Sequence, residues 1–469
     1  MTIDRRSWLK GAAVTAAGIA AMPAQAALRE RRISPGDRVN VAAIGAGGMG
    51  AANMERLTGQ NIVAIADPDL SHVAEAFVDA NGAPIAHRAA LKAAYDKADK
   101  YADYRRMLDT RKDIDAVVIA TPDQHHAVAA KMAMERGLHV YVQKPLTYTV
   151  REGRVLNALA EANPRLVTQM GNQGHSGDDG RRVVELIRGG AIGDVREVHV
   201  WTNRPTWPQG VARPAPVPTP AGFDWNVWLG PSTVGWGYNP LYAHFNWRGW
   251  APFGCGALGD MGAHLIDFPL WALEPGLPTR VETRHSAWGE NERPQGIPEG
   301  DQRGSYPLVT ITHFEFGKAK GGTINLTWYD GGLMPPTPRG LPPGAVMKPE
   351  GGVLYVGSQG MLMHETYGER PVLIGDGVAA RAAAIPQSLP RILNGIGGHE
   401  MNWIRAIRGE DKASSPFATA VPLNETMLLG IVAMRAGQPI DYDGAAGRIT
   451  NAPDANRYLD RAYREGWTL

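Results

Sequence analysis

The sequence is poor in cysteine, because Cys255 is the only one among 469 residues. No intrachain disulfide can therefore form, and the fold must be held by hydrophobic cores, for which a chain of this length is ample. An excess of one charge sign is also lacking, since the formal net charge at pH 7 is +1. This balance gives no reason to expect a nucleic-acid partner. Cys255 itself lies between glycines, where a lone cysteine is usually a buried apolar side chain rather than a nucleophile.

The N-terminus lacks an apolar run long enough for a membrane anchor. Arg5-Arg6 is followed by a weakly apolar run over residues 11–22 and then by Ala24-Gln25-Ala26. A run this short does not span a bilayer. An arginine pair, a short apolar run and a small-residue cleavage site are typical of a twin-arginine signal peptide. We therefore expect residues 1–26 to be read by the twin-arginine export machinery and the mature protein to be periplasmic or otherwise exported.

Glycine, by contrast, is abundant, and one cluster of it follows a short apolar run. Residues 39–44 predict a buried parallel strand, and residues 45–50 fit G-x-G-x-x-G before a helix-like segment. Gly45 permits the tight turn, Gly47 lets a pyrophosphate approach the backbone, and Gly50 lets the helix pack on the strand. The free N–H groups at the start of the helix suit phosphates. The segment therefore predicts a dinucleotide-binding site.

A second apolar run, residues 62–66, ends on Asp67, 22 residues after Gly45. A carboxylate at this distance accepts hydrogen bonds from both ribose hydroxyls of NAD, whereas NADP carries a phosphate there. The sequence therefore favours NAD over NADP. The alternative for Asp67 is a turn residue before Pro68.

Strand and helix patterns continue to alternate, with strands expected at 116–120 and 138–142 and a helix between them. Beyond residue 166, alternating segments rich in β-branched and aromatic residues predict an antiparallel sheet with one face covered. The predicted organisation is a signal peptide (1–26), a linker (27–38), a Rossmann domain (39–165), a substrate and oligomerisation domain (166–440) and a tail that packs back on the fold (441–469).

Seven of the 13 tryptophans lie between Trp201 and Trp250. Indole faces bind the C–H face of sugar rings, and indole N–H groups find polar partners. The cluster as a whole predicts a carbohydrate-sized pocket, although any single tryptophan has a core anchor as its alternative.

Directly after this cluster, Asp260, His264 and Asp267 are spaced to share one face of a helix. A carboxylate beside an imidazole is suited to proton transfer. A metal site would use the same spacing, but no third ligand points to one, so no metal is expected. A capped helix with satisfied polar groups is the remaining alternative.

Taken together, these features resemble the Gfo/Idh/MocA oxidoreductase family, and the resemblance covers nearly all of the mature chain. It is carried by the glycine motif, Asp67, Thr121-Pro122 with His126, Lys144-Pro145, and residues 256–264. It implies an α/β fold: a Rossmann domain followed by an α/β domain with an open, mostly antiparallel sheet. That sheet often forms an oligomer interface in the family, so a homodimer or homotetramer is expected.

The resemblance also assigns residues. Lys144 matches the lysine of the family's E-K-P motif, near the nicotinamide and the reacting hydroxyl, and Asp260 and His264 match G-G-x-x-x-D-x-x-x-H, with His264 as the usual acid/base. Gln143 stands where the family usually has Glu, which leaves open whether Lys144 or His264 transfers the proton. Asp123 replaces a common Asn. The remaining expected contacts are Thr121, Pro122, His126 and Gln143 to the cofactor, and Gln173, Trp247 and Arg248 to the substrate.

The expected function is hydride transfer between a sugar or polyol carbon and NAD. Because free NAD is not recycled outside the cytoplasm, an exported enzyme is expected to hold its cofactor tightly. The alternative is a redox-neutral, NAD-dependent glycosidase that acts through a transient keto-sugar. A third hypothesis is a non-catalytic sugar-binding protein.

Overall fold

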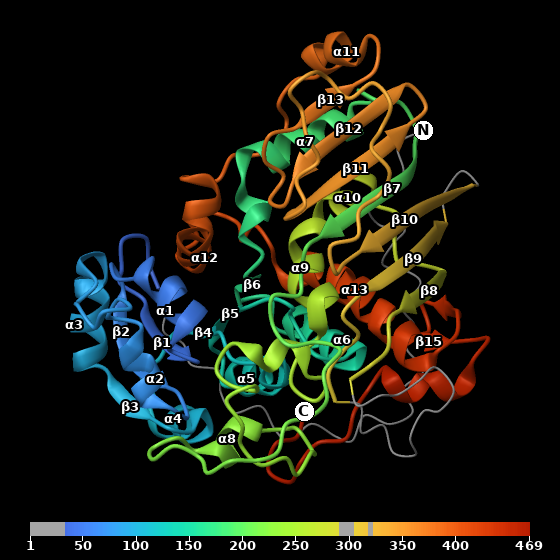
Figure 1. Cartoon of the computed structure of the whole chain (residues 1–469). Helices are drawn as coiled ribbons and strands as arrows, with labels where there is room; N and C mark the ends of the chain where they lie inside the picture. Colours follow the sequence, from blue (N-terminus) through green and yellow to red (C-terminus); the bar gives the residue numbers. More distant parts are fainter. Residues whose placement is uncertain (1–32, 290–303, 318–321) are drawn as a thin grey trace.

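The computed structural model describes residues 33–289, 304–317 and 322–469, in which two β-sheets form two domains (Figure 1). The proposed signal peptide and the first part of the linker lie outside the described residues. The first domain, blue to teal in Figure 1, lies beside the larger second sheet, whose strands run from green through gold and orange to red.

The first sheet has six parallel strands in the order β3-β2-β1-β4-β5-β6. Its central strands are short apolar runs that are almost wholly buried, as expected of parallel strands covered on both faces. The order is that of a doubly wound fold, so the predicted Rossmann domain is confirmed. The strands are β1 (Asn40–Ile44), β2 (Asn61–Ala66), β3 (Asp99–Tyr101), β4 (Ala116–Ile119), β5 (His139–Val142) and β6 (Thr168–Met170).

Helices from both domains cover the two faces of this sheet. One face packs against α1, α3 and α12, and the other joins a core that continues into the second domain. The helices of the first domain are α1 (Gly48–Glu55), α2 (Leu70–Glu75), α3 (Ala89–Lys97), α4 (Tyr104–Thr110), α5 (Asp123–Glu135) and α6 (Val150–Ala162). Those of the second are α7 (Asp178–Arg188), α8 (Trp225–Leu229), α9 (Gly256–Leu265), α10 (Asp267–Leu273), α11 (Val378–Ala384), α12 (His399–Ile407) and α13 (Phe417–Ala436).

The division between the domains is less sharp than a single boundary after residue 165. Strand β6 pairs with β5, so the first sheet extends past that point. Trp403 and Ile404 of α12 also belong to the core of the first sheet. The two domains therefore share side chains and fold against each other.

The second sheet has nine strands in the order β13-β12-β11-β7-β10-β9-β8-β14-β15. Among the described strands of this sheet, only the β7–β10 pair is parallel, which confirms the predicted mostly antiparallel sheet. The strands are β7 (Val195–Thr202), β8 (Arg280–His285), β9 (Thr310–Gly317), β10 (Thr323–Tyr329), β11 (Gly351–Gly357), β12 (Gly360–Glu365), β13 (Val372–Ile374), β14 (Ile440–Asp443) and β15 (Arg448–Ile449).

Helix α13 is the apolar centre of the second domain. It is long and hydrophobic enough to cross a membrane by composition, but 83% of its most apolar window is buried inside the protein. It packs against α6, α9 and β8, so it joins the two domains. The helix is therefore explained as a core element.

The C-terminal tail returns to the first domain. After β14 and β15 extend the second sheet, Trp467 packs edge-on to Tyr104, and the guanidinium of Arg105 lies 3.6 Å from the indole centre. The C-terminus accordingly lies near α8 in Figure 1, where Arg464 N donates to Pro231 O.

The turn between β1 and α1 explains two of the motif glycines. Gly45 has a φ of +78°, which favours glycine, and a Cβ on Gly50 would lie 1.9 Å from the Gly45 carbonyl oxygen. We expect Gly50→Ala to lower the free energy of unfolding by more than about 2 kcal/mol, because the backbone must move to admit the methyl group. Gly59→Ala, at a turn where a Cβ meets nothing within 4 Å, is the control and should change it by less than about 0.5 kcal/mol. Equal thermal or denaturant stability of the two variants would contradict this explanation.

Candidate functional site

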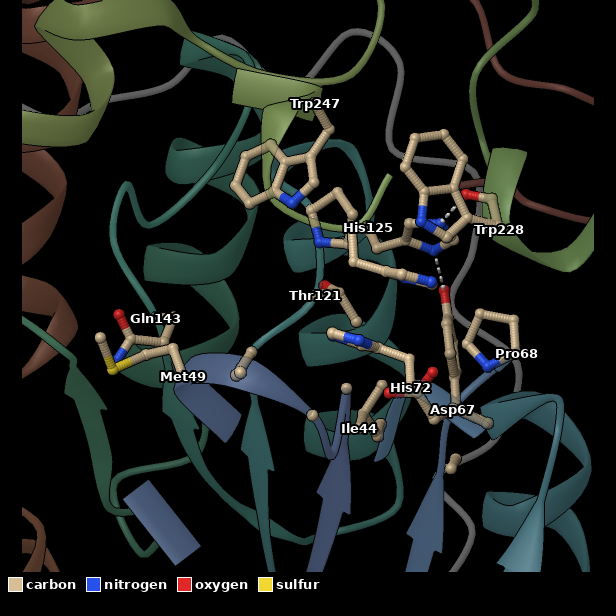
Figure 2. A pocket seen from close by; sticks show the side chains of 18 of the residues that line it. Ile44, Met49, Asp67, Pro68, His72, Thr121, His125, Gln143, Trp228 and Trp247 are labelled. Atoms are coloured by element: carbon tan, nitrogen blue, oxygen red, sulfur yellow. Dashed lines mark hydrogen bonds between the residues drawn. The ribbon is translucent and has the colours of Figure 1, made fainter. Parts of the chain in front are cut away.

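A cavity of about 370 Å³ opens at the carboxyl ends of the first-sheet strands. In such sheets this edge is where ligands bind. The cavity floor is the glycine turn after β1, and its roof is made by residues of the second domain between Val227 and Arg248. Figure 2 shows Trp228 and Trp247 above the strand ends, with Asp67 and Gln143 on opposite sides.

The glycine turn lines the cavity with backbone. Gly45, Gly47 and Gly48 all contribute to its wall, and among the described residues no side chain caps the start of α1. Amide groups at this helix end therefore remain available to an anion. A Cβ on Gly47 would lie 2.8 Å from the His72 ring, so His72 stands directly over this glycine.

Asp67 lies at the end of β2, as predicted, and lines the same cavity. Its two carboxylate oxygens accept hydrogen bonds from the backbone N–H groups of Ala46 and Asp69, at 2.9 and 3.0 Å. Burial raises the pKa of Asp67, and these hydrogen bonds oppose the rise. The backbone thus holds the carboxylate in one orientation at the edge of the cavity.

Thr121 and Pro122 line the cavity after β4, but His126 does not. The ring nitrogens of His126 lie 2.7 Å from the Pro145 carbonyl and 3.0 Å from the Thr121 carbonyl. Burial lowers the pKa of His126 to about 4. His126 therefore joins two cavity-forming turns from behind, instead of reaching the cofactor cavity as the sequence suggested.

Gln143 lines the cavity and is oriented by a chain of hydrogen bonds. Its Nε2 donates to Asn53 Oδ1 at 3.0 Å, and Asn53 Nδ2 donates to Glu400 Oε1 of α12 at 2.7 Å. An ionised Glu400 can only accept hydrogen bonds, so the amide NH2 group of Asn53 must point toward it. The amide oxygen of Asn53 then faces Gln143, whose NH2 group must point toward Asn53. Helix α12 of the second domain thereby sets the orientation of a cavity residue of the first.

Lys144 follows β5 and faces α9 of the second domain. Its Nζ donates to Asp260 Oδ1 at 2.6 Å and to the Asp260 carbonyl at 2.9 Å. Arg248 Nε donates to the same carboxylate oxygen at 3.1 Å. Burial alone would raise the pKa of Asp260, but the charges of Lys144 and Arg248 lower it below its usual range. The structure thus joins three predicted site residues in one ionic cluster, and two of them, Lys144 and Arg248, line the cavity.

His264 lies one helical turn after Asp260 on α9. Burial lowers the pKa of His264 to about 3, and the charge of Lys144 adds to this effect. The imidazole is therefore neutral at pH 7. Its Nδ1 is buried and has no hydrogen-bond partner among the described residues. The neutral ring is the form that accepts a proton, but a pKa of about 3 makes it a weak acceptor at pH 7, and neither His264 nor Asp260 is among the residues that line the cavity.

Asp123 is a second buried carboxyl beside this cluster. Its Oδ2 accepts from the backbone N–H of Cys255 at 2.9 Å, and the side chain is 2% exposed. Burial raises the pKa of Asp123 to about 7 and the charge of Asp260 reinforces this, while Arg248 opposes it. Asp123 therefore titrates near neutral pH within the site.

The tryptophan cluster is mainly a core. Trp228, Trp236, Trp247 and Trp250 pack with Phe253 and other aromatic side chains in one buried cluster. Only Trp228 and Trp247 line the cavity. The expected sugar platform is thus limited to these two, because the long loops that carry the others need aromatic anchors of their own.

Two further residues lie away from the cavity. Gln173 starts the 3-10 helix Gln173–Ser176 and is half-buried without lining the cavity. Asp267 begins α10 instead of continuing α9, and its carboxylate lies 2.8 Å from His175 Nδ1. Asp267 therefore holds His175, and does not share the Asp260–His264 site as the helical spacing suggested.

Sequence reasoning missed five aromatic cavity residues: His72, Tyr104, His125, His244 and Phe245. His125 Nε2 lies 2.8 Å from the Trp228 carbonyl oxygen, and Figure 2 shows this contact. His244 stacks on His72 with ring centres 3.8 Å apart. These residues stand in no motif, so the only sequence signal was that His125 directly precedes His126 and that His244 lies inside the aromatic cluster.

Comparison with known proteins agrees with this fold. Residues 39–170 match the oxidoreductase family, NAD-binding Rossmann fold, of Gfo/Idh/MocA proteins, and residues 194–283 match that family's C-terminal alpha/beta domain. Over these two segments the chain is similar to Gfo/Idh/MocA-family oxidoreductases, in which an NAD-binding Rossmann domain is followed by the family's C-terminal domain.

The individual relatives and solved structures match this chain either over part of its length or at low sequence identity. Glycosyl hydrolase family 109 protein 2 of Shewanella sp. (strain ANA-3) is 33% identical over 209 residues, which are 41% of this chain and 44% of that protein. The match thus spans less than half of that relative. The WlbA dehydrogenase of Bordetella pertussis, solved with NADH and UDP-GlcNAcA, has a TM-score of 0.57 at 16% identity, covering 87% of this chain and 99% of that one. Levoglucosan dehydrogenase with NADH and levoglucosan has a TM-score of 0.53 at 18% identity, covering 86% and 99%.

The buried Asp123 generates a prediction about stability. Because its pKa is about 7 in the folded state and about 3.9 in an unfolded chain, the folded state binds more protons between these values. Its contribution to stability is therefore complete below about pH 4 and is lost as the pH rises through 7. Asp123→Asn removes this titration.

In the original chain, this titration should lower the free energy of unfolding between pH 4 and pH 8 by at most about 4 kcal/mol, at about 1.4 kcal/mol per pKa unit. In Asp123→Asn this decline should be absent, so that the free energy of unfolding at pH 8 is higher relative to its value at pH 4 than in the original chain. Denaturant unfolding at the two pH values measures the difference. Asp376→Asn, which changes an exposed carboxylate, is the matched control and should leave the pH dependence unaltered. Parallel pH–stability curves for Asp123→Asn and the original chain would contradict the prediction.

Proposed function

We propose that the protein transfers hydride between a sugar or polyol carbon that bears a hydroxyl and an NAD cofactor held in the cavity. The observation that carries this proposal is the Lys144–Asp260 ion pair, which lies beside the neutral His264 where the NAD-binding domain meets the second domain. An alcohol oxidation needs a group that orients the hydroxyl and one that takes its proton. Both are present within one cluster.

The cavity fits a dinucleotide in three respects. The glycine turn exposes backbone amides, Asp67 presents a fixed carboxylate for ribose hydroxyls, and Lys144 stands at the opposite end. When bound, NAD supplies the hydride acceptor and donor. The residues of this chain supply the orientation and the proton transfer.

The two candidate proton-transfer groups differ in their surroundings. Lys144 is engaged by the carboxylate and the carbonyl of Asp260, so it is placed to donate a hydrogen bond to the substrate oxygen. His264 is the usual acid/base by family resemblance, and burial keeps its ring in the neutral form that accepts a proton. We therefore assign proton acceptance to His264 and orientation of the oxygen to Lys144, with Asp260 holding Lys144.

A carbohydrate substrate is supported by several relatives. The WlbA and levoglucosan dehydrogenase structures contain sugar ligands, and Trp228 and Trp247 offer indole faces in this cavity. The second candidate function is redox-neutral glycoside hydrolysis through a transient keto-sugar. It is favoured by the 33% identical relative, which is named as a glycosyl hydrolase. Both functions share the hydride-transfer step and the same residues.

We also propose that the chain is exported by the twin-arginine pathway and keeps its cofactor tightly bound through each reaction cycle. The motif at Arg5-Arg6, in the part of the chain outside the described residues, supports export. Family resemblance supports a homodimer or homotetramer built on the second sheet.

The test uses purified mature protein, residues 27–469, without added cofactor. Its absorbance at the reduced-nicotinamide band is followed while aldoses, ketoses, polyols and glycosides are added, and the products are assayed. Reduction by one sugar and reoxidation by a second carbonyl compound is the expected result. A spectrum that returns to its start with one glycoside, together with a cleaved sugar, would replace this function with the hydrolase. No response to any sugar by protein that contains NAD would refute both.

Lys144→Met is the accompanying variant, because it keeps the length of the side chain but removes the charge. We expect it to retain NAD and to lose at least about 100-fold in turnover, in the range of one positioned catalytic group. Lys131→Met, at a surface lysine paired with Glu135, is the matched control. Near-normal turnover of Lys144→Met would remove Lys144 from the mechanism.

Asp67 is expected to set the choice between NAD and NADP. Asp67→Ala should weaken NAD at least about tenfold while changing NADP less, since it removes a ribose partner and a charge that repels the 2′-phosphate. Titration of both dinucleotides by fluorescence measures this. An unchanged ratio of the two dissociation constants would reject the assignment.

A further inference from the structure

One segment of the second domain crosses over the cofactor cavity. We call residues 223–253, which include α8, the aromatic strap. Its aromatic side chains form their own buried cluster, in which Trp225 stacks on Trp228 at 4.4 Å. Trp250 Nε1 also donates to the Leu241 carbonyl at 2.7 Å. The aromatic strap thus has a buried core of its own.

The aromatic strap is attached to the first domain on both sides of the cavity. On the Asp67 side, Asp224 N donates to the Pro68 carbonyl at 2.8 Å. Farther along, the Trp228 carbonyl lies 2.8 Å from His125 Nε2, and the Phe253 carbonyl accepts from Gln124 N at 3.3 Å. Pro68, His125 and Trp228 all line the cavity, so these attachments form part of its wall.

The attachment nearest the glycine turn is a pair of stacked imidazoles. His72 from α2 and His244 from the aromatic strap are parallel within 3°, with ring centres 3.8 Å apart. A carboxylate holds each ring: His244 Nε2 lies 3.0 Å from Asp69 Oδ2, and His72 Nδ1 lies 3.0 Å from Glu75 Oε2. The pair is thus a noncovalent clasp between the two domains.

The clasp lies next to the glycine turn, where the dinucleotide pyrophosphate is expected to bind. A Cβ on Gly47 would lie 2.8 Å from His72 Cδ2 and 3.0 Å from His72 Nε2. Gly47, His72 and His244 line the same cavity, and Figure 2 shows His72 above the turn between Asp67 and Met49. In a glycine turn of this kind the dinucleotide pyrophosphate approaches the backbone at the start of the helix. The His72 ring therefore stands beside the place where the pyrophosphate must lie.

We propose that His72 and His244 cover the pyrophosphate site and that the dinucleotide leaves only when this clasp and the aromatic strap open. The inference rests on the proposed function in one respect, namely that the cavity binds NAD. It adds the residues that keep the cofactor in place, and it gives a structural cause for tight retention.

The test measures the dissociation rate of NADH instead of activity. Mature protein loaded with NADH is mixed with a large excess of NAD, and the loss of bound-NADH fluorescence is followed. We expect His244→Ala to raise the dissociation rate at least about tenfold, because affinity changes between variants of one site lie mostly in this rate. His244→Phe keeps a ring for stacking on His72 but loses the contact to Asp69, so it should give an intermediate increase.

His87→Ala is the matched control, because His87 is exposed on the first domain and does not line the cavity. It should leave the rate unchanged. If His244→Ala does not fold, as judged by thermal unfolding, His244→Phe carries the test alone. Equal rates in the original chain and the foldable His244 variants would overturn the clasp while leaving NAD binding intact. Failure of the original chain to bind NADH at all would instead overturn the proposed function together with the clasp.

Discussion

The contact between Lys144 and Asp260 is the interaction on which the site depends. It joins the end of β5 in the first domain to α9 in the second, and both side chains are 11% exposed. Burying two charges costs several kcal/mol per ion, which a good ion pair only roughly offsets. Arg248 and the Asp260 carbonyl supply additional partners, so the cluster is satisfied. This buried ion pair is explained better by a chemical role of its side chains than by a contribution to the free energy of folding. It holds one charged donor in place while burial keeps the neighbouring His264 neutral.

The second domain contributes more to the site than Arg248, Asp260 and His264. Helix α12 orients Gln143 through Asn53, and the aromatic strap forms the roof of the cavity. The NAD-binding domain thus supplies the floor of the site, and the orientation and cover come from residues far along the chain.

Much of the fold follows from local pattern. The apolar runs that became β1, β2, β4 and β5 are bounded by glycine, proline or charged residues, and they alternate with helical periodicity. The mostly antiparallel second sheet was predictable from alternating β-branched residues for the same reason. The position of β6 was not, because three residues carry too little pattern to show which sheet they join. The roles of His126 and Asp267 also differed from expectation, since helical spacing places side chains on a face but does not say what that face meets.

The sequence by itself determined the dinucleotide turn, the acidic residue after β2 and the spacing of Asp260 and His264 on one helix face, because each depends on residue type and short spacing. Lys144 was assigned by family resemblance, and the structure brought it to Asp260 from 116 residues away. Only the tertiary structure decided that most of the tryptophans form a core, that burial raises the pKa of Asp123 to about 7, and that His244 stacks on His72. Burial and contacts between distant segments come from packing of the whole chain, and no local pattern records which two segments will meet.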